Sequence, residues 1–206
     1  MRAPIALAIA AFALGCSEIA TPVRAPRYLF DVGGEVFHWP ADRLPVRYFA
    51  DSRGSMASLV REGLGMWEVQ FLYGEFRGVL VTDSTAADVI VLWQDSVPPD
   101  VAPDTAGALG ACDGVTTYQI DTTNAMEGPI RVALLLRPGF TTAQIAACVH
   151  RVAAHELGHT LGILTHSPAP TDLMFDTPGT QIPTHRDRNT VQVLYHTTST
   201  IAPPPR

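Results

Sequence analysis

The chain has 206 residues, of which 47% are hydrophobic and 17% charged, and this composition predicts one globular domain with an apolar core. Its formal net charge is −6, and it contains no run of Lys or Arg. An acidic chain without a basic stripe argues against nucleic acid as a partner and against electrostatic docking on anionic lipid.

Residues 1–15 are predicted to be a signal peptide, because a positive start precedes an apolar run over 5–14 that is too short for a permanent membrane span. The run ends in Ala13-Leu14-Gly15-Cys16, which resembles a bacterial lipobox. This resemblance implies that Cys16 is lipidated and anchors the protein to a membrane. Ser17 after it is typical of lipoproteins sent to the outer membrane. A plain secretory signal with an incidental cysteine is the alternative.

A Pro-rich stretch over 16–43 is predicted to be a tether, followed by a folded domain over 44–198 and a Pro-rich tail over 199–206. Apolar residues recur at three- and four-residue steps over 55–71, which predicts a helix with one apolar face. Runs rich in β-branched and apolar residues predict short strands. These runs are 44–50, 78–82, 88–93, 107–111, 115–120 and 130–136.

Two more helices are predicted in the second half of the chain. Thr141 with Gln144 forms a capping-box pattern, and an apolar face continues from there to His155. Gly162 is a natural end for this helix. A last helix is predicted over 184–195.

Cys112 and Cys148 are the two cysteines that remain once Cys16 carries lipid. An even number in an oxidising compartment favours a disulfide between them. Two buried free thiols are the alternative, because the sequence does not show whether the two residues are close.

Residues 155–159 carry a metal-binding pattern, His-Glu-x-x-His. Positions i and i+4 of a helix share one face, so His155 and His159 can reach one zinc ion at about 2.0–2.1 Å. Glu156 lies one step round the helix, where a carboxylate can take a proton from zinc-bound water without binding the metal. With His166 as third ligand, the site has the open arrangement of catalytic zinc. A helix with two surface histidines is the alternative.

The segment 155–167 resembles the extended zinc motif of the metzincins, above all of their matrixin-like branch, and Asp172-Leu173-Met174-Phe175 resembles their Met-turn. The resemblance implies that Met174 lies beneath the three imidazoles; a core methionine without that role is the alternative. It also implies an α+β fold, with a twisted mixed sheet packed on two helices, a Met-turn and a C-terminal helix. Family substrates bind in extended form along an edge strand above the zinc, and 107–111 is the candidate for that strand.

The spacing after Gly162 departs from the family pattern, which has two residues between this glycine and the third histidine, whereas this chain has three. Strict counting makes Thr165 the third ligand. Imidazole is a good zinc ligand and threonine a poor one, and the Met-turn methionine lies eight residues after His166, as in matrixin-like members. We therefore assign His166. A two-histidine site completed by Asp172 or His150 is the alternative.

These features predict a zinc-dependent endopeptidase that hydrolyses extracytoplasmic proteins or peptides, with one catalytic Zn²⁺, zinc-bound water as nucleophile and Glu156 as general base. We expect a monomeric lipoprotein of the bacterial cell envelope, held at the outer membrane through Cys16. Asp113 and Asp121 offer oxygen ligands for Ca²⁺, as in some family members, although such aspartates are usually turn formers.

Two other functions remain open. One is a catalytically silent binding lipoprotein with the metallopeptidase fold, and the other is a structural zinc protein of the envelope. The presence of Glu156 disfavours both, because loss of catalysis often removes the base and a structural site does not need one. The absence of a fourth protein ligand also disfavours structural zinc.

Overall fold

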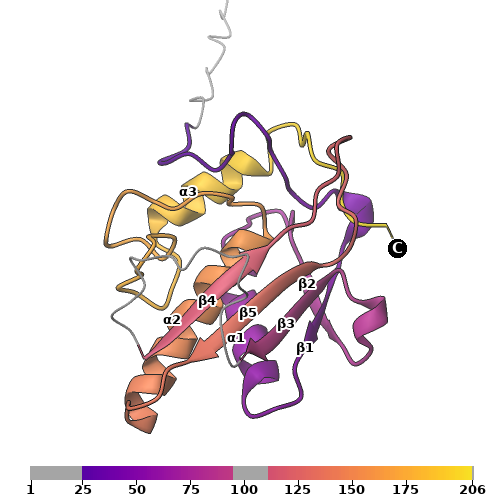
Figure 1. The fold of residues 1–206 in the computed structure, drawn as a ribbon. Helices are drawn as coiled ribbons and strands as arrows, with labels where there is room; N and C mark the ends of the chain where they lie inside the picture. The colour runs from indigo at the N-terminus through magenta and orange to yellow at the C-terminus, as the bar shows by residue number, and fades with distance from the viewer. Residues whose placement is uncertain (1–24, 95–110, 206) are drawn as a thin grey trace, which may run out of the picture.

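The computed structural model describes residues 25–94 and 111–205, and its centre is a five-stranded sheet (Figure 1). The strand order is β2-β1-β3-β5-β4, in which β4 runs antiparallel to β5 and the other neighbouring strands are parallel. The strands are β1 (Val46–Ala50), β2 (Gly78–Val81), β3 (Val89–Gln94), β4 (Cys112–Thr117) and β5 (Ile130–Leu136). The mixed sheet and three helices give the α+β class that the sequence predicts.

Two long helices form a second layer against this sheet. Helix α1 (Met56–Glu68) contacts β1, β2 and β3, and helix α2 (Thr142–Thr160) contacts β4 and β5. The two helices also contact each other, and the Trp67 indole donates a hydrogen bond of 2.8 Å to the Ala154 carbonyl. Helix α3 (His185–Leu194) lies beyond one end of the sheet, beside the first described residues (Figure 1). None of the described helices is long and apolar enough to cross a membrane.

Local sequence accounts for where the helices begin. Helix α2 starts with the predicted capping box, in which Thr141 and Gln144 bond each other's backbone. Helix α3 starts with a second capping box, between Thr184 and Asp187. Two short 3-10 helices precede strands: η1 (Ala41–Arg43) lies before β1, and η2 (Ser84–Ala86) lies between β2 and β3.

The predicted tether needs correction in its second half, because residues 25–43 are part of the folded domain. Tyr28, Phe30 and Phe37 lie in the hydrophobic core. The Trp39 side chain is buried as well, and its indole donates 2.8 Å to the Thr160 carbonyl at the end of α2. The one helix described in this stretch is the short 3-10 helix η1 (Ala41–Arg43), and the largely irregular backbone still buries these aromatic side chains. Residues 1–24, which include the predicted signal peptide and Cys16, lie outside the described part.

The tail also packs on the domain. Ile201 is buried, and Ala202 forms a bridge with Ala125. The predicted boundary at 198 therefore falls within packed structure.

Within the described residues the sheet ends in β2 on one side and in β4 on the other, and β4 follows the candidate edge strand at 107–111 in sequence. Residues 107–110 lie outside the described part, and Ala111 immediately precedes the strand. A disulfide joins Cys112, the first residue of β4, to Cys148 in α2, with a Cα–Cα distance of 5.8 Å. The edge strand is thus tied to the helix that carries the first two histidines.

Candidate metal centre

Three imidazoles converge at the C-terminal end of α2. His155 and His159 come from the helix, and His166 comes from the loop that follows it. One nitrogen of each ring lies within 4.8 Å of the other two, and within the described residues these three form the single group suited to a metal ion. His155 is buried, whereas His166 is exposed, so the group is open to solvent on the side of the loop.

Hydrogen bonds to backbone carbonyls orient both helix histidines. His155 Nδ1 lies 2.7 Å from the Leu173 carbonyl oxygen, and His159 Nδ1 lies 2.5 Å from the Ile163 carbonyl oxygen. Because a carbonyl only accepts, each Nδ1 carries the proton and each Nε2 keeps its lone pair. Such partners are what metal-binding histidines have in known sites.

The spacing of the two Nε2 atoms fits zinc. They lie 3.1 Å apart. Two lone pairs facing each other at this distance repel unless a cation lies beside both of them. Tetrahedral coordination with bonds of 2.0–2.1 Å places two ligand nitrogens about 3.3 Å apart. The donor set and its spacing therefore suit a zinc ion.

Burial keeps the helix imidazoles neutral near pH 7, as metal binding requires. The pKa of His155 is well below its usual value, first because the ring is buried and second because His159 and His166 are close. Burial and the neighbouring His166 lower the pKa of His159 to about 4. A metal ion thus displaces no proton from these two rings at neutral pH.

The turn after α2 determines which residue is the third candidate ligand. Gly162 ends the helix with φ of 108°, and an added Cβ there would lie 1.8 Å from the Phe37 carbonyl oxygen. Three residues, 163–165, then separate Gly162 from His166. Thr165 donates its hydroxyl proton to the Leu29 carbonyl, whereas His166 turns toward the other two histidines. The structure therefore brings together the residues that the sequence assigns, without Thr165.

The alternative ligands are engaged elsewhere. Asp172, the first residue of the Met-turn segment, accepts from Arg186 at 2.9 Å and from Ser167 at 2.5 Å. His150 Nδ1 lies 3.3 Å from a carboxylate oxygen of Glu62 in α1. Neither side chain belongs to the three-histidine group.

Met174 packs against the part of α2 that carries the first two histidines, and its place beneath the three imidazoles stays a prediction. It is fully buried, and its sulfur packs beside Gly158 of α2, between the two helix histidines in sequence. Its carbonyl accepts from the Ser167 amide at 2.7 Å, so the Met-turn is joined directly to the residue after His166.

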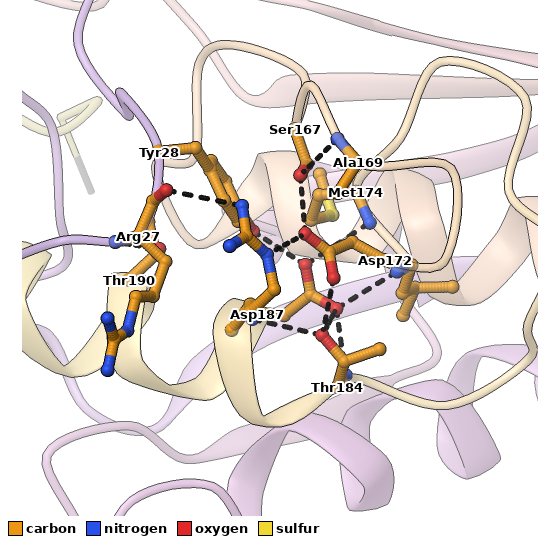
Figure 2. A network of polar contacts seen from close by, with 11 residues as sticks. Arg27, Tyr28, Ser167, Ala169, Asp172, Met174, Thr184, Asp187 and Thr190 are labelled. Carbon is orange, nitrogen blue, oxygen red and sulfur yellow. Dashed lines mark hydrogen bonds and ion pairs between the residues drawn. The ribbon is translucent and has the colours of Figure 1, made fainter.

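A buried polar network supports the Met-turn from below (Figure 2). Asp187 is fully buried and accepts from the amides of Leu173, at 2.9 Å, and Met174, at 3.4 Å. The Tyr28 hydroxyl donates to the same carboxylate at 2.7 Å, and burial with this carboxylate raises the pKa of Tyr28. Since the Leu173 carbonyl in turn holds His155, a side chain from the predicted tether is linked to a candidate metal ligand.

Glu156 is buried against the edge strand. Its side chain accepts from the Thr116 hydroxyl at 2.6 Å. Gly114 passes so close that an added Cβ would lie 2.7 Å from Glu156 Oε1. Just after the end of β4, the Tyr118 hydroxyl lies 2.5 Å from the His159 carbonyl oxygen. Gly114, Thr116 and Tyr118 were not predicted as site residues. They occupy alternate positions in and directly after a short strand, and this pattern could have indicated that they share one face.

The two candidate calcium ligands have partners within the chain. Asp113 forms an ion pair with Arg137 at 2.9 Å. Asp121 accepts from the amides of Thr123 and Ala125, which lowers the pKa of its carboxyl, and this is a turn-forming arrangement. Calcium thus gains no support from the described residues.

Comparison with known proteins relates this chain to a family that agrees with the fold and the site. The family model described as matrixin matches residues 50–196, which contain all three α-helices, strands β2 to β5 and the three histidines. None of the curated proteins matches the chain. Because the match covers most of the chain and agrees with the fold and the site, the chain belongs to the matrixin family of zinc metallopeptidases.

Proposed function

We propose that this matrixin is an active endopeptidase that cleaves extended segments of extracytoplasmic proteins or peptides, with Glu156 as general base. The observation that carries the proposal is that the Nε2 atoms of His155 and His159 lie 3.1 Å apart with their lone pairs free for a metal. Each ring is oriented by its Nδ1 proton, which is donated to a backbone carbonyl. The sequence places Glu156 next to His155 in α2, and the residue is 5% exposed.

The residues divide the chemistry as follows. His155, His159 and His166 would hold the zinc ion, which when bound polarises the scissile carbonyl and makes water acidic enough to ionise near neutral pH. Glu156 accepts the proton from the attacking water and passes it to the leaving amine. Met174, which is fully buried, would provide the apolar base beneath the imidazoles.

The edge strand supplies a surface for an extended substrate. Within the described part of the chain, β4 pairs with β5 on one side and has no strand on its other side. A peptide can add to such an edge through main-chain hydrogen bonds. Since Thr116 of this strand contacts Glu156, a peptide paired there lies close to the general base.

We also propose that the protein acts outside the cytoplasm, as a lipoprotein anchored through Cys16. A disulfide between Cys112 and Cys148 supports this proposal, because such bonds persist in oxidising compartments. Labelling of producing cells with a radioactive fatty acid tests the anchor. Wild type should carry label and Cys16→Ser should not; label on both variants would refute lipidation at this residue.

Cleavage of an unfolded protein tests the activity itself. Zinc-loaded wild type should cut the substrate, while Glu156→Gln should keep the metal and lose the activity by a factor of about 100 or more. If wild type binds zinc and cuts no unfolded protein or peptide, the alternative of a catalytically silent binding protein replaces the proposal. If Glu156→Gln cuts as fast as wild type, Glu156 is not the base.

A further inference from the structure

The contact between Glu156 and the edge strand carries an inference that rests on the proposed function and deepens it. The Thr116 hydroxyl lies 2.6 Å from Glu156 Oε2 and 3.2 Å from the Glu156 carbonyl oxygen. A hydroxyl has one proton to donate. Distances of 2.5–2.7 Å are typical of a hydroxyl bound to an ionised carboxylate, so the proton goes to Oε2.

The carboxylate has little room to move away from this hydroxyl. Glu156 is 5% exposed. On the strand side, Gly114 brings the backbone of β4 against the side chain: an added Cβ would lie 2.7 Å from both Glu156 Cγ and Oε1, and 2.4 Å from Val152 Cγ1. The base therefore lies between α2 and β4, with one oxygen bound to a residue of β4.

The strand itself is held in register with α2 on both sides of this contact. Cys112, at its start, is joined to Cys148 by the disulfide. Tyr118, just after its end, bonds the His159 carbonyl at 2.5 Å. These attachments hold the strand against the metal-binding end of the helix, and Thr116 lies between them.

We propose that Thr116 is the positioning residue for the general base. Its hydroxyl holds the Glu156 carboxylate in one rotamer and ties it to the strand that pairs with the substrate, so that one short strand sets the distance between base and scissile peptide. Side chains at alternate strand positions face the helix, which is why 114, 116 and 118 all meet α2. Thr116 touches neither metal nor substrate in this scheme and acts through Glu156.

The test compares Thr116→Val, which keeps the shape and removes the hydroxyl, with Thr116→Ser, which keeps the hydroxyl. Misplacing a base and removing a charge-assisted hydrogen bond should lower kcat by about tenfold to a hundredfold in Thr116→Val. KM for a short peptide and the zinc content should stay within about twofold of wild type, because neither substrate nor metal contacts the hydroxyl. Thr116→Ser should retain kcat within about threefold.

The matched control is Thr197→Val. Thr197 follows α3, and its hydroxyl donates a hydrogen bond of 2.9 Å to the Val193 carbonyl within that helix. This variant should leave kcat unchanged. If Thr116→Val unfolds or loses zinc, the pair Thr116→Ser and Thr116→Ala decides in its place, with serine active and alanine impaired.

The outcomes separate this inference from the proposed function. Active wild type together with Thr116→Val at wild-type kcat overturns the positioning role alone. Equal loss in Thr116→Ser and Thr116→Val also overturns it, since the hydroxyl would then not be the group that matters. A zinc-loaded wild type that cleaves nothing overturns the proposed function, and this inference with it.

Discussion

The disulfide between Cys112 and Cys148 should be a major contribution to the stability of the domain. The two cysteines are 36 positions apart in sequence, and the bond closes this segment, which contains all of β5, into a loop. In the chain-entropy model, closing a loop of this length in the unfolded state raises the free energy of unfolding by about 4 kcal/mol. Breaking the bond should therefore remove about that much.

The cleanest comparison is the metal-free wild type in its oxidised and reduced forms, because reduction keeps every side chain and adds only two thiol hydrogens. Urea unfolding should give a lower midpoint for the reduced form. It should also give a larger dependence on urea, since the unfolded chain without the cross-link exposes more surface. The double variant Cys112→Ala, Cys148→Ala should behave like the reduced protein, with an additional loss from the smaller side chains.

A loss below about 1 kcal/mol on reduction would refute the reasoning. It would mean that the unfolded state is constrained by other means, or that β4 separates from α2 without cost. An unchanged urea dependence together with the full loss would place the effect in the folded state instead.

Three further predictions concern the surroundings of the metal centre. Gly162→Ala should destabilise the metal-free protein by about 3 kcal/mol or more in thermal unfolding, because φ is 108° and the new Cβ would meet the Phe37 carbonyl oxygen at 1.8 Å; a change below about 1 kcal/mol would contradict the geometry. Tyr28→Phe removes a hydrogen bond of 2.7 Å to the buried Asp187 carboxylate and should lower the free energy of unfolding by about 1.5–3 kcal/mol. The variant should also lose zinc to a chelator faster than wild type. An unchanged rate of zinc loss would show that the network does not affect the metal site. The metal-free protein should lose stability between about pH 6.5 and pH 4, by at most about 1.4 kcal/mol per pH unit for each of the two helix histidines. The reason is that the unfolded rings take up protons in this range, whereas the folded rings, with lowered pKa values, do not. Urea unfolding at pH 7 and pH 5 measures this, and equal or greater stability at pH 5 would contradict it.

The sequence predicted the local features well. Thr141 with Gln144 marked the start of α2, and the i, i+4 spacing placed His155 and His159 on one helix face. These are short-range patterns whose physics lies within a few residues. The choice of His166 over Thr165 also agrees with the structure, because ligand chemistry outweighed a strict count.

Long-range partners were the part that sequence did not reveal. Tyr28 lies 159 positions from Asp187, and an irregular Pro-rich stretch shows no periodicity that would predict burial. Thr116 looks like an ordinary strand residue in the sequence, because its partner Glu156 lies 40 positions later and the two meet only when β4 packs on α2. The predicted strand at 115–120 overlaps β4 but misses its start, since a run containing Gly114 is a poor strand signal although the close approach to Glu156 requires that glycine.

The central claim is that His155, His159 and His166 hold a zinc ion on which peptide cleavage depends. The most direct measurement is zinc per protein by elemental analysis together with cleavage of one peptide, for wild type, His166→Ala and Thr165→Ala. The account predicts about one zinc and activity for wild type and Thr165→Ala, and loss of both for His166→Ala. Full zinc and activity in His166→Ala would contradict the three-histidine site.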